Sequence, residues 1–254
     1  MLYLTQKNEP DLSSFSRFDV NDWEQVKTHI AYRIMNRKTF DVQNKNDNII
    51  HKDCLDLSMV CIVKELSKDR KNILSYNLTK EDLEKFGKTE DEILEIAQDN
   101  VAKDTHKRIH TLKQDIIAKE TMYPLMRFPD GAMMGGANAL IEDSSDDKDN
   151  VVIITNKYNV YGASYMFDFN TLEEVHNRMQ DSFYILPLSI HQLMCISSKY
   201  ATKDKSISEA EDDLLDMLYN INSNNKKEED ILTYRMYYYA ADDGGTIMSI
   251  KQQL

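Results

Sequence analysis

The stretch VVIITNKYNVYGASYMF (151–167), followed after a polar interval by SFYILPLSIHQLMCIS (182–197), decides the fold that we predict. Residues 151–155 are a β-branched run, NKYN has the composition of a turn, and residues 160–167 are a second run rich in apolar and aromatic side chains. Two such runs around a short polar turn are typical of an antiparallel hairpin.

A helix and two further strands follow this hairpin. Thr171 and Glu174 have the spacing of a capping box, which predicts a helix over 171–181. FYILP and IHQLMCIS are then predicted strands, bent at Pro187 because proline cannot donate to a strand ladder. The order is therefore strand–turn–strand–helix–strand, which favours an antiparallel sheet with helices on one face.

The segments beyond residue 197 extend this part of the fold. Ser208 and Glu211 are spaced as a second capping box and predict a helix whose core side carries Leu214, Leu215, Leu218 and Ile221. A polar linker leads to a last predicted strand, TYRMYYYAA (233–241), which ends at DDGG. Tyr237 and Tyr239 share one face of that strand, where they form either a binding platform or ordinary packing against a helix.

The first half of the chain predicts a helical and two-stranded part. Apolar residues at helical spacing predict an amphipathic helix over 22–37, and apolar runs predict strands at 55–63 and 73–78. Three capping boxes predict helices in this half of the chain. Thr79 with Asp82 starts a short helix that Gly87 closes, and Thr89 with Glu92 starts a helix over 90–103. Thr111 with Gln114 starts a helix over 112–119.

A change of composition separates the two halves. PDGAMMGGANALIEDSSDDKDN (129–150) holds three of the seven glycines and ends in a run of acids, so we expect an exposed loop or linker. The predicted organisation is an N-terminal α+β part over 1–128, this flexible loop, and a C-terminal α+β part over 151–254. The predicted fold class is α+β.

Charge and cysteine content limit the classes of function. Asp and Glu outnumber Lys and Arg by 43 to 31, which gives a net charge of −12 and disfavours direct binding of nucleic acid or of anionic membranes. Three cysteines give no disulfide framework, and no secretion signal or membrane-spanning run is present in the sequence. We therefore expect a cytoplasmic protein.

The same segments resemble a known family. VVIITNKYNVYGASYMF, the helix after it and SFYILPLSIHQLMCI are similar to the uncharacterised bacterial "domain of unknown function" family 5688 of gut Firmicutes, where a "TN…GA" hairpin leads to a helix and then to "FYILPSSIHE". The resemblance spans roughly residues 20–245 and implies bacterial or phage origin without any known activity. Leu188 stands here in place of the first serine of the pattern, and Gln192 in place of the glutamate that follows His191.

Tests for cofactor and metal motifs are negative. GGAN does not follow a strand as a dinucleotide-binding motif does, and the sequence contains no phosphate-binding P-loop motif. His51 with Cys54, and His106 with His110, have metal-ligand spacing but lack further ligands, and DSSDDKD lacks the glycine and glutamate of an EF-hand. We predict neither a metal nor a cofactor.

One residue is a candidate for catalysis. No nucleophile-elbow motif is present, Cys61 and Cys195 lie in apolar runs, and Cys54 has only His51 and Asp56 nearby. His191 follows the predicted bend at Pro187, where its ring could face a cleft. The competing interpretation is that this ring hydrogen-bonds to backbone at the bend.

The most direct functional reading is a non-enzymatic protein that binds another macromolecule. A finer hypothesis is an acidic, DNA-mimicking inhibitor of a basic nucleic-acid-binding bacterial defence protein, encoded on a phage or mobile element. The acids that would contact this partner are Asp143, Asp146, Asp147, Asp149, Glu209, Glu211, Asp212, Asp213 and Asp216. The alternatives are a small-molecule-binding or hydrolytic enzyme with a cleft near His191, and an assembly subunit.

Overall fold

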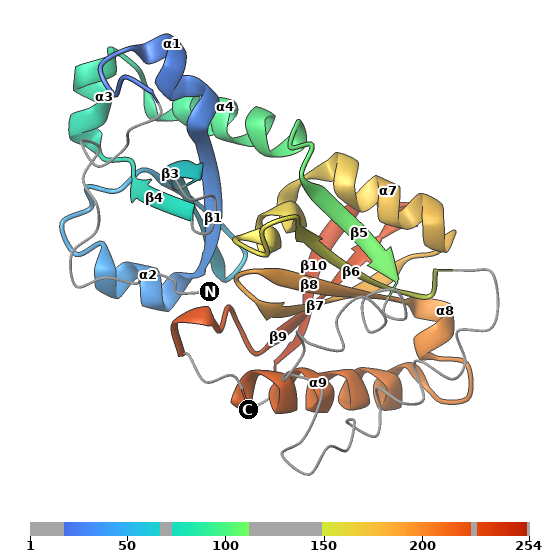
Figure 1. The fold of residues 1–254 in the computed structure, drawn as a ribbon. Coiled ribbons are helices and arrows are strands. Elements are labelled where there is room, and N and C mark those ends of the chain that lie inside the picture. Colours follow the sequence, from blue (N-terminus) through green and yellow to red (C-terminus); the bar gives the residue numbers. More distant parts are fainter. Residues whose placement is uncertain (1–17, 67–72, 112–148, 225–227, 253–254) are drawn as a thin grey trace. The chain divides into compact units, whose positions relative to one another are not determined.

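A computed structural model describes residues 18–66, 73–111, 149–224 and 228–252. The chain divides into two compact units, Met1–Thr105 and His106–Leu254 (Figure 1). Each unit combines an antiparallel sheet with helices, so the predicted α+β class is confirmed. The boundary lies earlier than the predicted end of the N-terminal part at residue 128.

The sheet of the first unit is built around one long strand, β3. Its strands are β1 (Ile30–Asn36), β2 (His51–Cys54), β3 (Leu57–Leu66) and β4 (Ile73–Asn77). β1 pairs along one edge of β3, while β2 and β4 share the other edge, β2 near its start and β4 near its end. Cys61 lies between them, because its N–H donates to the Ile50 carbonyl and its carbonyl accepts from the Leu78 N–H.

Short helices complete this unit: α1 (Trp23–Val26), η2 (Lys27–His29), α2 (Arg37–Gln43), α3 (Lys80–Phe86) and α4 (Glu90–Ala102). The capping boxes predicted at Thr79 and at Thr89 are both present, and Gly87 ends α3 in the left-handed conformation. α4 packs against β1, with Ile93, Ala97 and Val101 buried.

The predicted helix over 22–37 is wrong. The chain is helical only as far as His29 and then enters β1. The apolar residues Val26, Ile30 and Ile34 match a helical period, but Ala31 and Tyr32 are buried too, so the strand is covered on both faces. A strand buried on both faces gives no alternation to distinguish it from a helix.

The second unit has a six-stranded antiparallel sheet in the order β10-β9-β7-β8-β6-β5. The strands are β5 (Lys107–Thr111), β6 (Val151–Asn156), β7 (Phe183–Ser189), β8 (Gln192–Ser197), β9 (Arg235–Ala240) and β10 (Thr246–Gln252). The helices are η4 (Gly162–Phe167), α7 (Phe169–Met179), α8 (Ser198–Ala201), α9 (Ile207–Ser223), η5 (Glu228–Asp230) and η6 (Ala241–Asp243).

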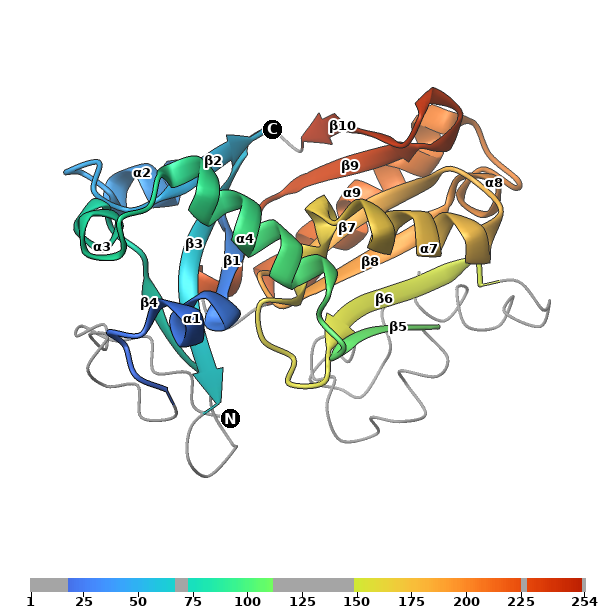
Figure 2. The ribbon, with the colours of Figure 1, turned by 90° about the horizontal axis from the view of Figure 1, so that it is seen from above.

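Helices cover both faces of this sheet, not one face as expected. α7 and α9 lie on opposite sides of it (Figures 1 and 2). Leu214, Leu215, Leu218 and Ile221 of α9 pack with alternate residues of the central strands in one core cluster. On the α7 side, Tyr239 stacks on Phe183 and its ring lies 6.5 Å from that of His176. The tyrosine-rich strand β9 therefore uses this face for packing.

Several boundaries differ from the sequence predictions. The second arm of the predicted hairpin, 160–167, is mostly the 3-10 helix η4, so β6 pairs with β5 and β8 instead. α9 begins two residues early, with Ser206 and Glu209 as its capping box, and DDGG leads into β10. The bend expected at Pro187 corresponds to a register shift between Pro187 and Ser189. The predicted helix 112–119 lies outside the described residues, as does 129–148 of the predicted loop.

Candidate functional site

The residues of the "TN…GA" and "SIH" motifs meet at one end of the second sheet. They surround the loop Lys157–Tyr161, which joins β6 to η4 and which we call the signature loop. Asn156 holds this loop from within. Its Nδ2 donates to the Val160 carbonyl at 2.6 Å, and its Oδ1 accepts from the N–H groups of Tyr158 and Val160.

Thr155 and Gly162 bring the β7–β8 turn against this loop. The Thr155 hydroxyl donates to the His191 carbonyl at 3.0 Å. Gly162 lies against the same carbonyl, since a Cβ placed on it would be 2.4 Å from the His191 oxygen and 2.7 Å from the Thr155 Cα. Any larger residue at 162 would therefore separate the two segments.

His191 is buried and uses both nitrogens of its ring. Its Nδ1 accepts the N–H of Tyr161 at 3.1 Å, and its Nε2 lies 3.3 Å from a carboxylate oxygen of Asp230 in η5. Because Nδ1 is an acceptor, the neutral ring carries its proton on Nε2 and donates it to Asp230. Ser189 adds a hydroxyl that accepts the N–H of His191.

Of the two interpretations of His191 that the sequence left open, the hydrogen bond to backbone is present. The ring also meets an acid from another element, Asp230. With a backbone N–H on one nitrogen and Asp230 on the other, the ring in this arrangement fixes the positions of three chain segments. A proton transfer to a substrate would require one of those contacts to open first.

The signature loop displays a fixed set of side chains. Asn159 and Tyr161 both have left-handed backbone, with φ of 53° and 55°. Lys157 is exposed, Tyr158 and Tyr161 are half-buried, and the Tyr158 ring lies 5.1 Å from that of His106. A bulky residue such as Tyr161 adopts positive φ only where its surroundings hold it there, and here the bond to His191 does so.

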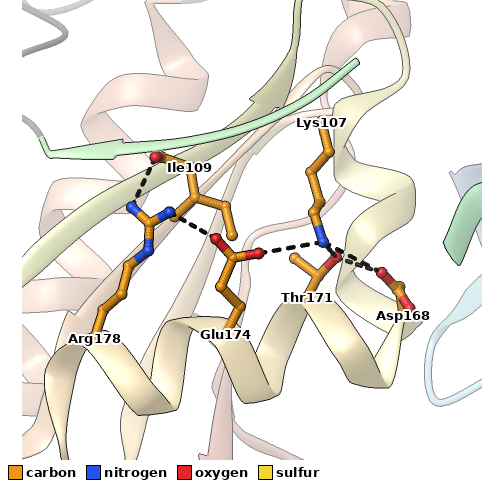
Figure 3. Close-up of polar contacts among 6 residues, drawn as sticks. All are labelled: Lys107, Ile109, Asp168, Thr171, Glu174 and Arg178. Atoms are coloured by element: carbon orange, nitrogen blue, oxygen red, sulfur yellow. Dashed lines mark hydrogen bonds and ion pairs between the residues drawn. The ribbon is translucent and has the colours of Figure 1, made fainter. Parts of the chain in front are cut away.

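A second polar cluster fastens β5 to α7 (Figure 3). Lys107 donates to the Thr171 hydroxyl at 3.0 Å and lies 3.4 Å from Glu174 and 3.9 Å from Asp168. Thr171 also donates to Asp168, which occupies the N-cap position of α7. α7 begins at Phe169, so the predicted helix over 171–181 starts two residues late.

Arg178 completes the second cluster. Its guanidinium pairs with Glu174 at 2.6 Å and donates to the Ile109 carbonyl at 2.9 Å. Lys107 and Arg178 therefore tie the edge strand β5 to α7 at two points. Because all of these groups satisfy one another, the cluster is best explained as support for the sheet edge.

The acidic residues that we predicted as a contact surface are only partly available. Asp143, Asp146 and Asp147 lie outside the described residues, and Asp149 is 3.9 Å from Arg178. Glu209 caps its own helix, where the Ser206 backbone N–H holds its pKa below the usual range, and Asp213 pairs with Lys205 at 2.6 Å. Asp212 and Asp216 are exposed on α9, and Glu211 is half-exposed.

The two residue pairs that have metal-ligand spacing in the sequence make other contacts in the structure. His51 Nδ1 bonds to the Ile49 carbonyl, and the Cys54 thiol donates to the Met59 sulfur. Within the described ranges, no group of three or more His, Cys, Asp and Glu side chains is placed to hold a metal ion. His106 directly precedes β5, and His110 lies within it.

The three thiols are suppressed as nucleophiles. Burial raises the pKa of Cys61 to about 12, with a smaller contribution from Glu90. Burial alone raises the pKa of Cys195 further, and it also raises the pKa of the half-buried Cys54. A thiol enzyme needs a lowered thiol pKa, so this trend is opposite to what that chemistry requires.

Comparison with known proteins bears on the family alone. A model described as "Family of unknown function (DUF5688)" matches residues 1–241. The chain belongs to this family. No curated protein and no solved structure matches this DUF5688 member. Among the helices of the part of the chain that is described, none has the length and apolar character needed to cross a membrane.

Sequence reasoning missed two members of the site in this DUF5688 chain. Asp230 lies in the polar run KKEED, 39 residues from His191, and no local pattern marks it as a partner. Asn156 was visible as the N of ITNKYN, but its part as the internal clamp of the loop depends on the turn that follows. The glutamate missing at Gln192 is not needed for the contact that His191 makes.

Proposed function

We propose that the protein acts in the cytoplasm by binding another macromolecule, and that the signature loop is a main contact surface. The observation that supports this most is the way the loop is held. Asn156, Thr155 and His191 fix it from three directions, and it presents Lys157, Tyr158 and Tyr161 at the surface.

A loop held in one conformation binds with little loss of conformational entropy. Tyrosine is enriched in recognition surfaces because it supplies a large, rigid contact area and one polar atom. Since two tyrosines occur within four residues of a constrained loop, their exposed parts form a preorganised patch. Lys157, whose Nζ lies 5.9 Å from the Tyr158 ring centroid, adds a cation beside that patch.

A second candidate surface is the outer side of α9. Ile207–Ser223 contains Glu209, Glu211, Asp212, Asp213 and Asp216 and no Lys or Arg, and its apolar side is fixed to the sheet. This supports the finer proposal of an acidic inhibitor that mimics the charge of DNA towards a basic nucleic-acid-binding defence protein. Glu211, Asp212 and Asp216 lie along the solvent-facing side of α9 and would make the contact.

The experiment is capture of partners from the native host with the tagged full chain, followed by purification of each captured protein and measurement of its Kd. The loop variant is Tyr158→Ala with Tyr161→Asn, because Asn tolerates the left-handed backbone at 161. The control is Val42→Ala, an exposed apolar residue on α2 in the first unit.

A rise in Kd of about tenfold or more in the loop variant, with little change in the control, supports the loop as the contact surface. The acidic α9 candidate makes a different prediction. Asp212→Asn with Asp216→Asn should weaken binding, and the wild-type Kd should rise steeply with salt. If no purified protein binds the wild-type chain, the binding function is wrong.

A further inference from the structure

The tip of the β2–β3 hairpin carries a residue that is unfavourable for its backbone. Cys54 pairs with Leu57, so the loop consists of Leu55 and Asp56 alone. Leu55 has a φ of 60°, and Asp56 is not among the residues with positive φ. Positive φ at the first loop position only is the pattern of a type II′ turn, in which that position normally holds glycine.

The side chain of Leu55 gains little from the fold in return. It is 44% exposed, among the larger exposed apolar residues of the described chain. For a leucine in the core, burial of apolar area offsets the cost of a strained backbone. Leu55 leaves much of its own apolar area in water. Glycine or asparagine would fit the turn better and expose no apolar surface.

The surroundings of Leu55 hold the tip rigid. The Arg37 guanidinium pairs with Asp53 at 2.8 Å, and the Arg37 N–H donates to the Asp56 carbonyl at 3.1 Å. The Ser58 hydroxyl also donates to Asp53, at 2.7 Å. An apolar side chain thus projects from a turn whose polar neighbours are paired with one another.

We propose that Leu55 is an anchor residue that enters an apolar pocket on a partner protein. The proposal rests on the proposed function. It adds a contact in the first unit of the chain to the contact that the signature loop makes in the second unit. An exposed apolar side chain on a rigid turn can bury apolar area in a partner with little loss of conformational entropy. A strained backbone with no internal purpose is the kind of local misfit that marks functional positions.

The chemistry around the tip favours a protein pocket over a lipid surface. Asp53 and Asp56 lie within two residues of Leu55, and an anionic membrane repels carboxylates at that depth. A protein pocket can place donors opposite them. The partner is therefore expected to offer an apolar pocket with hydrogen-bond donors or cations at its rim.

The first measurement is the stability of the full chain by denaturant titration. Leu55→Gly and Leu55→Asn should both raise the folding equilibrium constant, by about threefold to tenfold, because each relieves the left-handed strain. The control is Val42→Ala, which trims a 65% exposed apolar residue from α2 without a backbone conflict. Loss of stability in both Leu55 variants would overturn the strain argument and the proposal.

The second measurement uses the partner purified as described for the proposed function. Leu55→Gly and Leu55→Asn should raise its Kd about tenfold or more, while Val42→Ala leaves it unchanged. Weaker binding by a more stable protein is a result that a structural role for Leu55 would not produce. An unchanged Kd overturns the anchor and leaves the binding function intact, whereas a wild-type chain without any partner overturns both.

Sedimentation with vesicles of phosphatidylcholine and phosphatidylserine tests the lipid alternative. The proposal expects no binding by the wild-type chain. Binding that Leu55→Gly abolishes would overturn the protein pocket in favour of a membrane contact.

Discussion

Gly162 lies so close to His191 that no side chain fits between them, since a Cβ on Gly162 would be 2.4 Å from the His191 carbonyl oxygen. The second near atom is also backbone, the Thr155 Cα at 2.7 Å, so rotation of a side chain cannot relieve the conflict. The close approach therefore makes glycine a requirement at this position.

Gly162→Ala is expected to lower the free energy of unfolding by about 3 kcal/mol, because the loop and the turn must move apart. Gly87→Ala is the matched control. Gly87 has a φ of 63° with nothing within 4 Å of an added Cβ, so only the backbone conformation opposes alanine, at about 1 kcal/mol. Denaturant titration measures both, and equal losses would contradict the close packing at Gly162.

Asn156→Ala should loosen the signature loop. It removes one donor and one acceptor and leaves the N–H of the buried Val160 without its side-chain partner, which predicts a loss of about 2 kcal/mol. The amides of Tyr158 and Val160 should exchange hydrogen faster. Asn224→Ala, at the exposed end of α9, should change stability by less than about 0.5 kcal/mol. Unaltered exchange in the loop would count against Asn156 as its clamp.

His191 and Asp230 should be energetically coupled. In a double-mutant cycle with His191→Ala and Asp230→Ala, we expect a coupling free energy of about 1 kcal/mol, measured by denaturant titration near neutral pH. Each single variant leaves the other group without its partner, so the double variant should lose less stability than the sum. Additive losses would show that the contact contributes nothing.

The capping carboxylate of α9 predicts a pH-dependent stability. Hydrogen bonds from Ser206, the backbone N–H first, hold the pKa of Glu209 below its usual range. Stability from such a group is present above the unfolded pKa, roughly 4.3, and is lost as the pH falls through the lower native pKa. Glu209→Gln should therefore be less stable than wild type near neutral pH and equal to it in acid.

Glu95→Gln controls for the change in net charge, because Glu95 is an exposed carboxylate within α4. Loss of this one charge should leave the stability close to that of wild type near neutral pH. A Glu209→Gln deficit that persists in acid would mean that the carboxylate charge is not what the cap uses.

The thiols predict a graded reaction with alkylating reagents. Burial raises the pKa of Cys61 to about 12 and also raises that of Cys195, so neither should react in the native protein at a pH of about 8. Cys54 is half-buried and should react slowly. Mass spectrometry should find one adduct on the native chain and three after denaturation. The Cys54→Ser variant should acquire no adduct in its native state. An adduct on Cys61 or Cys195 would show that the core around that thiol opens.

Local sequence signals predicted much of the secondary structure, because capping boxes and turns act over a few residues. The boxes at Thr79 and Thr89 are present, and the strands near 57–63, 73–77 and 183–197 follow their apolar runs. For residues 30–36, tertiary burial was the cause of the wrong prediction. Ile30–Asn36 reads as a helix because both faces of the strand are covered, which hides the alternation.

The candidate site was predictable only in part. His191 and the residues of the "TN…GA" hairpin stand out in the sequence, but their convergence requires η4 in place of the expected second strand. That change brings Gly162 against His191, and no spacing rule contains it. Asp230 is 39 residues from its partner His191, and Glu174 is 67 residues from its partner Lys107. Only the folded chain reveals these two contacts.

The pairing of β5 with β6 has a consequence for how this chain can change in evolution. Thr111, the last residue of β5, lies opposite Val152 in the ladder, so the long connection leaves and re-enters the sheet at neighbouring positions. Strand register therefore fixes where these two positions lie, but it sets no particular number of residues between them. A change in that number is compatible with the same pairing of β5 with β6.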